Sequence, residues 1–255
     1  MVGRSDLGKV EVFPLKGLPE VGNGSDVAGL VIAALGRSGI RLKNRDIVVV
    51  THKIVSKAEG HVVRLSEVIP GRRAKSLAKA KGKDPRLLEL VLRESVRVVR
   101  SGHGVVITET KHGFVCANSG VDQSNVRKGY ASLLPADSDL SARRIRRALE
   151  DRTGRRLAVV VTDTFGRPWR RGQTDVAIGC SGIDPLVSFR GKVDRFGYAL
   201  RVTEPAVVDE VAGAAELTMG KLDRVPVAVV RGVRYADGEG GVKSLIMQKE
   251  RDLFR

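Results

Sequence analysis

Between residues 157 and 179 the chain reads Leu157-Ala158-Val159-Val160-Val161-Thr162-Asp163-Thr164-Phe165-Gly166-Arg167-Pro168-Trp169-Arg170-Arg171-Gly172-Gln173-Thr174-Asp175-Val176-Ala177-Ile178-Gly179. Its unbroken apolar, β-branched start is typical of a strand buried on both faces, so we predict a strand over 157–162. Asp163 and Thr164 stand where that strand ends, and three arginines follow. We therefore predict an active-site loop after the strand. A site for a metal ion and phosphate is the first to test.

The rest of the chain alternates strand-like apolar runs with segments of helical spacing. The predicted elements are strands at 10–13, 46–51, 176–180 and 225–230, a hairpin of 104–109 with 114–117, and helices over 72–81, 85–99, 141–152 and 207–219. A further helix is predicted to start at Ser25 as its cap and to end near Gly36 or Gly39. No linker or repeat marks a domain boundary.

The composition is that of a globular protein with an aliphatic core. Of the 255 residues, 42% are hydrophobic but only 4% are aromatic. Cys116 and Cys180 lie in apolar contexts without CxxC spacing, so we expect buried thiols in a reducing compartment. The polar start at 1–6 resembles no signal sequence, and no apolar run is long enough to span a membrane. We expect a cytoplasmic protein.

The net charge of +16 raises the possibility of an anionic partner. Basic residues crowd two predicted helices, at 72–83 and 143–156, where solvated helix faces are the commoner explanation. No zinc-finger spacing, RNA-binding aromatic motif or helix-turn-helix pattern accompanies them. Nucleic acid is therefore not the expected partner.

Two more polar segments follow predicted strands, at 53–60 and 118–125, and both are predicted to be loops. Asp122 and Asn125 from the second segment, with Asp163 and Thr164, offer hard oxygen ligands that suit Mg²⁺ or Mn²⁺ better than zinc. Asp122 alone also fits an ordinary turn former. The occurrence of three such segments together favours a site.

The basic and aromatic residues near these segments can be interpreted either as ligand contacts or as ordinary surface and packing residues. Lys53 and Lys57 are either phosphate contacts or solvated charges. Arg167, Arg170 and Arg171 are suited to clamp phosphate or carboxylate oxygens, and Trp169 either stacks on a flat ring or anchors the loop. No P-loop motif occurs and no GxGxxG motif follows a strand, so a nucleotide site here has another architecture.

Three motifs together resemble those of the coenzyme F420-0:L-glutamate ligase family. They are the segment from Val48 to Gly60, the turn 120–126, and 162–167 continued by 172–179. The resemblance runs in order from about Val10 to Lys243. Because the chain ends at Arg255 without a nitroreductase-like domain, it is similar to the stand-alone archaeal type.

The resemblance implies a GTP-dependent ligase that adds L-glutamate to the phospholactyl carboxylate of F420-0, and then a second glutamate through a γ-linkage. The implied route phosphorylates the carboxylate, and the glutamate amine then displaces phosphate from the acyl phosphate. Two Mg²⁺ or Mn²⁺ ions are implied, with K⁺ as a further cofactor. The implied fold is α+β (mixed α/β), with two interleaved subdomains and mixed sheets in one domain over 1–255, forming an intertwined homodimer.

The resemblance also assigns residues. Asp122, Asp163 and Thr164 are the implied metal ligands, and Asp122, Asp163 and Lys57 the implied catalytic groups. The implied GTP contacts are Lys16, Gly17, Leu18, Pro19, Ser56, Lys57, Asn125, Met219, Gly220 and Lys221. After Met219-Gly220, some archaeal relatives have an acidic, glycine-rich segment, whereas this chain has Lys221-Leu222-Asp223-Arg224.

Two alternatives stay open at the level of sequence. One is a basic protein that binds RNA or nucleotides without catalysis, and the other is a metal-dependent phosphotransferase with another carboxylate acceptor. For the ligase, His52 and Glu59 are both positioned in sequence to act as the general base.

Overall fold

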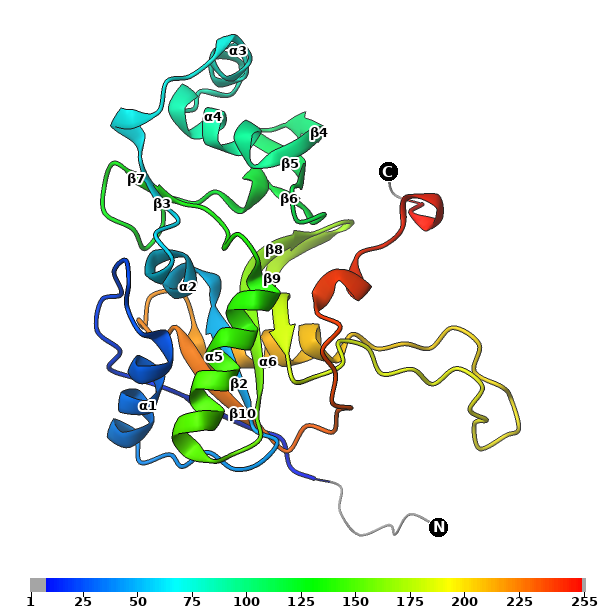
Figure 1. Ribbon diagram of the computed structural model, residues 1–255. Coiled ribbons are helices and arrows are strands. Elements are labelled where there is room, and N and C mark those ends of the chain that lie inside the picture. Colours follow the sequence, from blue (N-terminus) through cyan, green and yellow to red (C-terminus); the bar gives the residue numbers. More distant parts are fainter. Residues whose placement is uncertain (1–7, 254–255) are drawn as a thin grey trace.

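A five-stranded mixed sheet forms the centre of the protein (Figure 1). The computed structural model describes residues 8–253, so the polar start at 1–6 lies outside the described residues. The strand order is β1 (Glu11–Pro14), β10 (Val227–Arg231), β2 (Ile47–Thr51), β8 (Ala158–Arg167) and β9 (Arg170–Ser181). Only β2 and β8 run parallel, and the other neighbours are antiparallel.

Helices cover both faces of this sheet. Alternate side chains of the central strands, such as Val48 and Val159, pack in one core with α1 (Val27–Arg37) and α5 (Ser138–Thr153). The intervening side chains, such as Val49, pack in a second core with α6 (Val207–Met219). The prediction of strands buried on both faces is therefore confirmed. None of the described helices combines the length and apolarity needed to cross a bilayer.

Residues 62–133 leave the sheet and form a second, smaller unit (Figure 1). It contains the paired strands β3 (Val62–Arg64) and β7 (Tyr130–Ser132), the helices α3 (Arg72–Lys81) and α4 (Pro85–Arg93), and a sheet of β4 (Ser95–Gly102), β5 (Val105–Thr110) and β6 (Val115–Ala117). A separate cluster that includes Leu88 and Val106 is its core. The chain then returns through α5 to β8, so this unit is inserted between β2 and β8 of the mixed central sheet. Its own strands pair antiparallel, and the expected mixed α/β fold is confirmed.

The prediction of a loop at 53–60 was wrong, because α2 spans His52–Ala58. Ile54 and Val55 are buried, and the segment holds no glycine or proline before Gly60. Gly60 has a φ of 75°, a conformation that glycine adopts without strain, and it follows the C-cap residue Glu59.

The predicted helix over 85–99 was also wrong in its second half. Helix α4 ends at Arg93, and β4 begins at Ser95 and pairs with β5. Val96, Val98 and Val99 are β-branched residues that suit a strand, and pairing with β5 decided between the two states. The hairpin of β5 and β6 lies where the sequence predicted it.

The predicted loop after Thr162 was wrong as well. Strand β8 continues to Arg167 and pairs with β9 from Val159 onwards, and Trp169 turns the chain with a φ of 61°. Polar residues on both strands made this hairpin look like a loop in the sequence. A strand in a projecting ribbon is exposed and therefore need not be apolar.

Two predicted helix starts were wrong, by one residue for α1 and by three for α5. Helix α1 is capped by Asp26 and not by Ser25, because Asp26 Oδ1 accepts a hydrogen bond of 3.0 Å from Gly29 N. Helix α5 begins at Ser138, where Asp137 Oδ1 accepts a bond of 2.9 Å from Leu140 N. Carboxylate caps satisfy the free N–H groups of the first turn.

Short 3₁₀ turns complete the fold at η1 (Leu65–Glu67), η2 (Asn118–Gly120), η3 (Val242–Leu245) and η4 (Lys249–Arg251). A long connection over 184–206 projects from the body between β9 and α6 (Figure 1). Its two sides are joined by an isolated bridge between Val193 and Ala199. We call this segment the arm.

Candidate functional site

Four distant segments of the chain meet at one end of the central sheet. Leu15 N donates to Val227 O at 2.9 Å, which places the loop after β1 beside the loop before β10. Thr51 N donates to Pro226 O at 2.9 Å, and Thr51 pairs with Thr162 across the parallel strands. The start of α2, the region around Asp163, and the loops at 15–20 and 220–226 therefore share this sheet end.

His52, the first residue of α2, contacts Asp163 of β8. Its side chain is 2% exposed, and Nε2 lies 3.2 Å from Asp163 Oδ1 without the alignment of a hydrogen bond. Its Nδ1 lies 3.4 Å from Ser56 Oγ, and Asp163 Oδ1 also accepts a bond of 2.7 Å from Thr164 N. The Asp163 side chain remains 15% exposed, so the carboxylate is held in place but still reachable.

Lys53, the next residue, binds Asp122 of the smaller unit. Its ammonium group donates to Asp122 Oδ2 and to Ser124 Oγ, and Ser124 N donates to Asp122 Oδ1 at 2.9 Å. Burial raises the pKa of Asp122, but the hydrogen bonds from Lys53 and Ser124 more than offset this and hold the pKa below its usual range. A backbone bridge between Asp122 and Ser132 fixes the turn.

Adjacent residues of α2 therefore contact the two aspartates predicted as metal ligands. Among residues 8–253 no group of three or more histidine, cysteine, aspartate or glutamate side chains is arranged to hold a metal ion. Two carboxylates nevertheless fit Mg²⁺ or Mn²⁺, because such ions keep several waters and take further oxygens from substrate phosphates. Cys116 lies nearby as a neutral thiol, since burial and then the charge of Asp163 raise its pKa to about 12.

Thr164 faces away from Asp163. Its Oγ1 donates to Asp175 Oδ1 at 2.6 Å, and Thr162 Oγ1 donates to Asp175 Oδ2 at 3.3 Å. Because side chains alternate along a strand, Thr162 and Thr164 share one face of β8 and Asp163 has the other. The side chains of the predicted metal ligands are thus divided between two faces of the hairpin.

Lys221 completes the Thr164 face. Its Nζ donates to Thr164 Oγ1 at 2.7 Å and to Asp175 Oδ1 at 3.1 Å, and it lies 3.2 Å from Glu216 Oε1. Burial lowers the pKa of Lys221, but the carboxylates of Asp175 and Glu216 more than offset this and raise it. A permanent positive charge therefore lies against Thr164.

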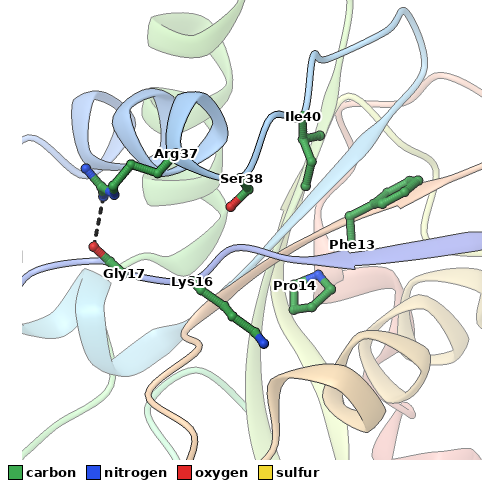
Figure 2. A pocket seen from close by; sticks show the side chains of 7 residues that line it. All are labelled: Phe13, Pro14, Lys16, Gly17, Arg37, Ser38 and Ile40. Carbon is green, nitrogen blue, oxygen red and sulfur yellow. Dashed lines mark hydrogen bonds between the residues drawn. The ribbon is translucent and has the colours of Figure 1, made fainter.

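The loop predicted to contact GTP borders a pocket at the β1 edge of the sheet. The pocket measures about 470 Å³, and its lining comprises Phe13, Pro14, Lys16, Gly17, Arg37, Ser38 and Ile40 (Figure 2). Arg37 Nη2 donates to Gly17 O at 2.9 Å, which ties this loop to the end of α1. Leu18 is partly buried against the core instead, and Pro19 is exposed.

The other predicted GTP contacts have mixed surroundings. Lys57 Nζ lies 2.5 Å from Glu20 Oε1, beside the same loop. Asn125 shares the turn of Asp122 and has a φ of 55°. Ser56 and Met219 are fully or almost fully buried, so their side chains belong to the interior, whereas Gly220 ends α6 with a φ of 59°.

The structure places the basic residues after Asp163 at the tip of the β8–β9 hairpin. Arg167 pairs with Arg170 there, Arg167 Nη2 donates to Arg171 O at 2.8 Å, and Trp169 is 83% exposed. At about 3.3 Å per residue, Arg167 is about 13 Å farther along the strand than Asp163. These residues belong to a projecting ribbon and not to the cluster around the aspartates.

Asp175 and Glu216 were missed as site residues. Asp175 is 4% exposed and lies directly across the hairpin from Thr164. Two features of the sequence could have indicated Asp175. Thr162 and Thr164 stand at alternate positions of the preceding strand, and Asp175 lies in a polar run that can pair with them, because cross-strand partners share a face. No pattern in the neighbouring sequence predicted the contact between Glu216 and Lys221. Of the two candidate bases, His52 is at the site, whereas Glu59 accepts a bond of 2.5 Å from Ser141 Oγ at the other end of α2.

Comparison with known proteins shows the family to which the chain is similar. Residues 17–232 match the family described as F420-0:Gamma-glutamyl ligase. A relative from Methanothermobacter thermautotrophicus, named Coenzyme F420:L-glutamate ligase, is 45% identical over 249 residues, which are 96% of this chain and 99% of the relative. Relatives of the same name from Methanocaldococcus jannaschii and Methanopyrus kandleri are 44% identical (84% of this chain, 86% of the relative) and 41% identical (97% of both).

Proposed function

Because this chain belongs to the F420-0:gamma-glutamyl ligase family, we propose that it joins L-glutamate to coenzyme F420-0 with consumption of GTP. One observation carries the proposal: two adjacent residues of α2 contact the two aspartates, His52 contacting Asp163 and Lys53 contacting Asp122. This arrangement places two carboxylates and a lysine at one sheet end. The lysine can attract a phosphoryl oxygen directly, and the carboxylates can hold a divalent ion that attracts another.

The chemistry explains why such a site needs phosphate. A carboxylate is a poor electrophile, so its oxygen first attacks the γ-phosphorus of GTP, and GDP leaves. The glutamate amine then attacks the acyl carbon, the C–O bond to phosphate breaks, and the nitrogen loses a proton. A divalent ion held by Asp122 and Asp163 would supply positive charge against the γ-phosphate. The product carries one more glutamyl group, and a second addition by the same steps gives the γ-linkage.

The protein's own side chains supply positioning and charge. Lys53 lies between Asp122 and Ser124, within reach of a phosphate oxygen bound at the carboxylates. His52 is too deeply buried to meet a glutamate amine directly, so we assign it the positioning of Asp163. Glu59 is engaged by Ser141 and is the weaker candidate for direct chemistry.

The geometry of the sheet end supports a nucleoside triphosphate lying across it. The pocket of Lys16 and Arg37 is at the β1 edge, and Asp163 is on β8, three strands away. At about 4.8 Å per strand this is about 14 Å, comparable to the length of an extended nucleoside triphosphate. We propose that the base lies near the pocket and the phosphates near Lys57 and Lys53.

The arm supports the homodimer. It carries Val193, Phe196, Tyr198 and Val202 with 62–83% of each side chain exposed. Apolar side chains on a projecting segment lose contact with water when a second copy covers them. We propose that two copies exchange arms. The buried free thiols of Cys116 and Cys180 support a reducing compartment such as the cytoplasm.

The proposal is tested with purified protein, F420-0, L-glutamate, GTP and Mg²⁺ or Mn²⁺. We expect mass spectrometry to find F420 with one and then two glutamyl groups, and one GDP for each bond. Equal turnover with ATP contradicts the choice of GTP. Phosphorylation of other carboxylates without F420-0 supports the phosphotransferase, and tight, salt-sensitive RNA binding without ligation supports the nucleic-acid alternative.

A further inference from the structure

The Thr164 face of the hairpin holds a cation that belongs to the chain itself. The Lys221 ammonium donates hydrogen bonds to Thr164 Oγ1 at 2.7 Å and to Asp175 Oδ1 at 3.1 Å, and it forms an ion pair with Glu216 Oε1 at 3.2 Å. An ammonium group has three N–H donors and no acceptor, so oxygens are the partners it requires.

These oxygens come from separate elements, so the arrangement is built by the fold. Thr164 and Asp175 face each other across β8 and β9, and Glu216 is in the last turn of α6. Lys221 follows immediately after Gly220, whose φ of 59° ends the helix and directs the chain back over the hairpin. Asp175 is also fixed by Thr162 Oγ1 at 3.3 Å and is 4% exposed.

This face does not fit a divalent ion in the present chain. A hydroxyl and two carboxylates are suitable oxygen ligands for Mg²⁺ or Mn²⁺. The ammonium group of Lys221 already contacts all three of these oxygens, and a divalent ion there would meet a like charge at close range. On the other side Lys53 contacts Asp122 and Ser124, and the carboxylate of Asp163 stays 15% exposed. Lys221 is moreover tethered, so it occupies the position without the loss of translational freedom that a free ion has on binding.

We propose that Lys221 is an internal cation that replaces a divalent ion on the Thr164 face, so that the protein binds divalent metal only on the Asp122 and Asp163 side. The metal ion at Asp122 and Asp163 is part of the proposed function, and the inference rests on that function for this ion alone. The Lys221 side chain is 53% exposed, which leaves its charge available to a phosphate or carboxylate oxygen of a bound substrate.

The test is the number of Mn²⁺ ions bound per chain, measured by calorimetry and by electron paramagnetic resonance of free Mn²⁺. We expect Lys221→Met to bind one Mn²⁺ more than the unaltered protein, because the oxygens of Thr164, Asp175 and Glu216 become available. Lys221→Arg, which keeps the charge, and Lys79→Met, which removes an exposed lysine on α3, are expected to leave the number unchanged.

A second variant locates the added ion. Asp175→Asn introduced into Lys221→Met is expected to abolish the gain, and circular dichroism checks that each variant is folded. If Lys221→Met binds the same number of ions as the unaltered protein, the inference is overturned. The proposed function is tested separately with Asp163→Asn in the protein that keeps Lys221. It is contradicted if this variant binds as much Mn²⁺ as the unaltered protein.

Discussion

Lys53 binds the carboxylate of Asp122 although 69 positions separate them in the chain. Lys53 lies at the start of α2, at the end of the central sheet, and Asp122 belongs to the inserted unit. The contact therefore joins the two parts of the protein at the site itself. A neighbouring contact, between His52 and Asp163, joins the same helix to β8. The site depends on how α2 packs against both parts.

Asp122→Asn and Asp163→Asn are each expected to lower ligase turnover on the order of 10²–10³-fold, because each removes a carboxylate that would hold the divalent ion at the reacting phosphoryl group. Initial rates of GDP release with F420-0 and glutamate measure this. Asp151→Asn, on the exposed face of α5, is the matched control and is expected to keep full activity. Full activity of either site variant would remove that aspartate from the site.

Lys53→Met is expected to make the protein more sensitive to acid. Hydrogen bonds to Asp122 hold its pKa below the unfolded value, so Asp122 contributes stability above the unfolded pKa, which is lost as pH falls through the folded pKa. Without Lys53 the folded pKa rises, and the acid unfolding midpoint moves to higher pH. Circular dichroism during acid titration measures it. An unchanged midpoint would show that the contact does not hold Asp122 in its charged form.

Asp175→Ala is expected to destabilise the fold by about 1–3 kcal/mol, because the hydroxyls of Thr162 and Thr164 lose a buried acceptor. Urea unfolding followed by circular dichroism measures the free energy of unfolding. Asp223→Ala, in the exposed loop after α6, is the comparison and is expected to change it little. Equal effects of the two changes would contradict a structural role for Asp175.

The two thiols are expected to be unreactive in the native protein. Burial is the main cause that raises the pKa of both Cys116 and Cys180 to about 12, so neither forms much thiolate at pH 8. Labelling with a thiol reagent is expected to be slow in buffer and to reach both groups in denaturant. Because unfolding lets the thiols ionise near pH 9, stability is expected to fall as pH rises from about 9 towards 12. Rapid native labelling at pH 8 would contradict this.

Replacing Phe196 and Tyr198 by aspartate is expected to produce a monomer, because charged side chains cannot be buried in an apolar contact between two copies. Light scattering during size-exclusion chromatography measures the mass of the unaltered and changed proteins. Leu222→Asp, an exposed apolar residue outside the arm, is the control. A monomeric unaltered protein, or a dimeric variant, would contradict arm exchange.

Much of the sheet domain follows from local pattern. The β-branched runs before Thr51 and Asp163 predicted the two central strands, and the apolar spacing of 207–219 predicted α6. In the smaller unit, α3 and the start of α4 follow the prediction, but β4 does not. The segment at 94–99 contains residues that suit either state, and only its pairing with β5 made it a strand.

Sequence by itself determined the central strands that bring Asp163 to the sheet end and supplied candidate residues for the site, since periodicity and residue type are properties of neighbours in the chain. Tertiary structure alone decided which of them meet. The pairing of β8 with β9 turned Thr164 towards Asp175 and Asp163 towards His52, because side chains alternate along a strand. The return of the chain after α6 placed Lys221 on the Thr164 face. Such contacts depend on packing between distant segments, which local pattern does not record.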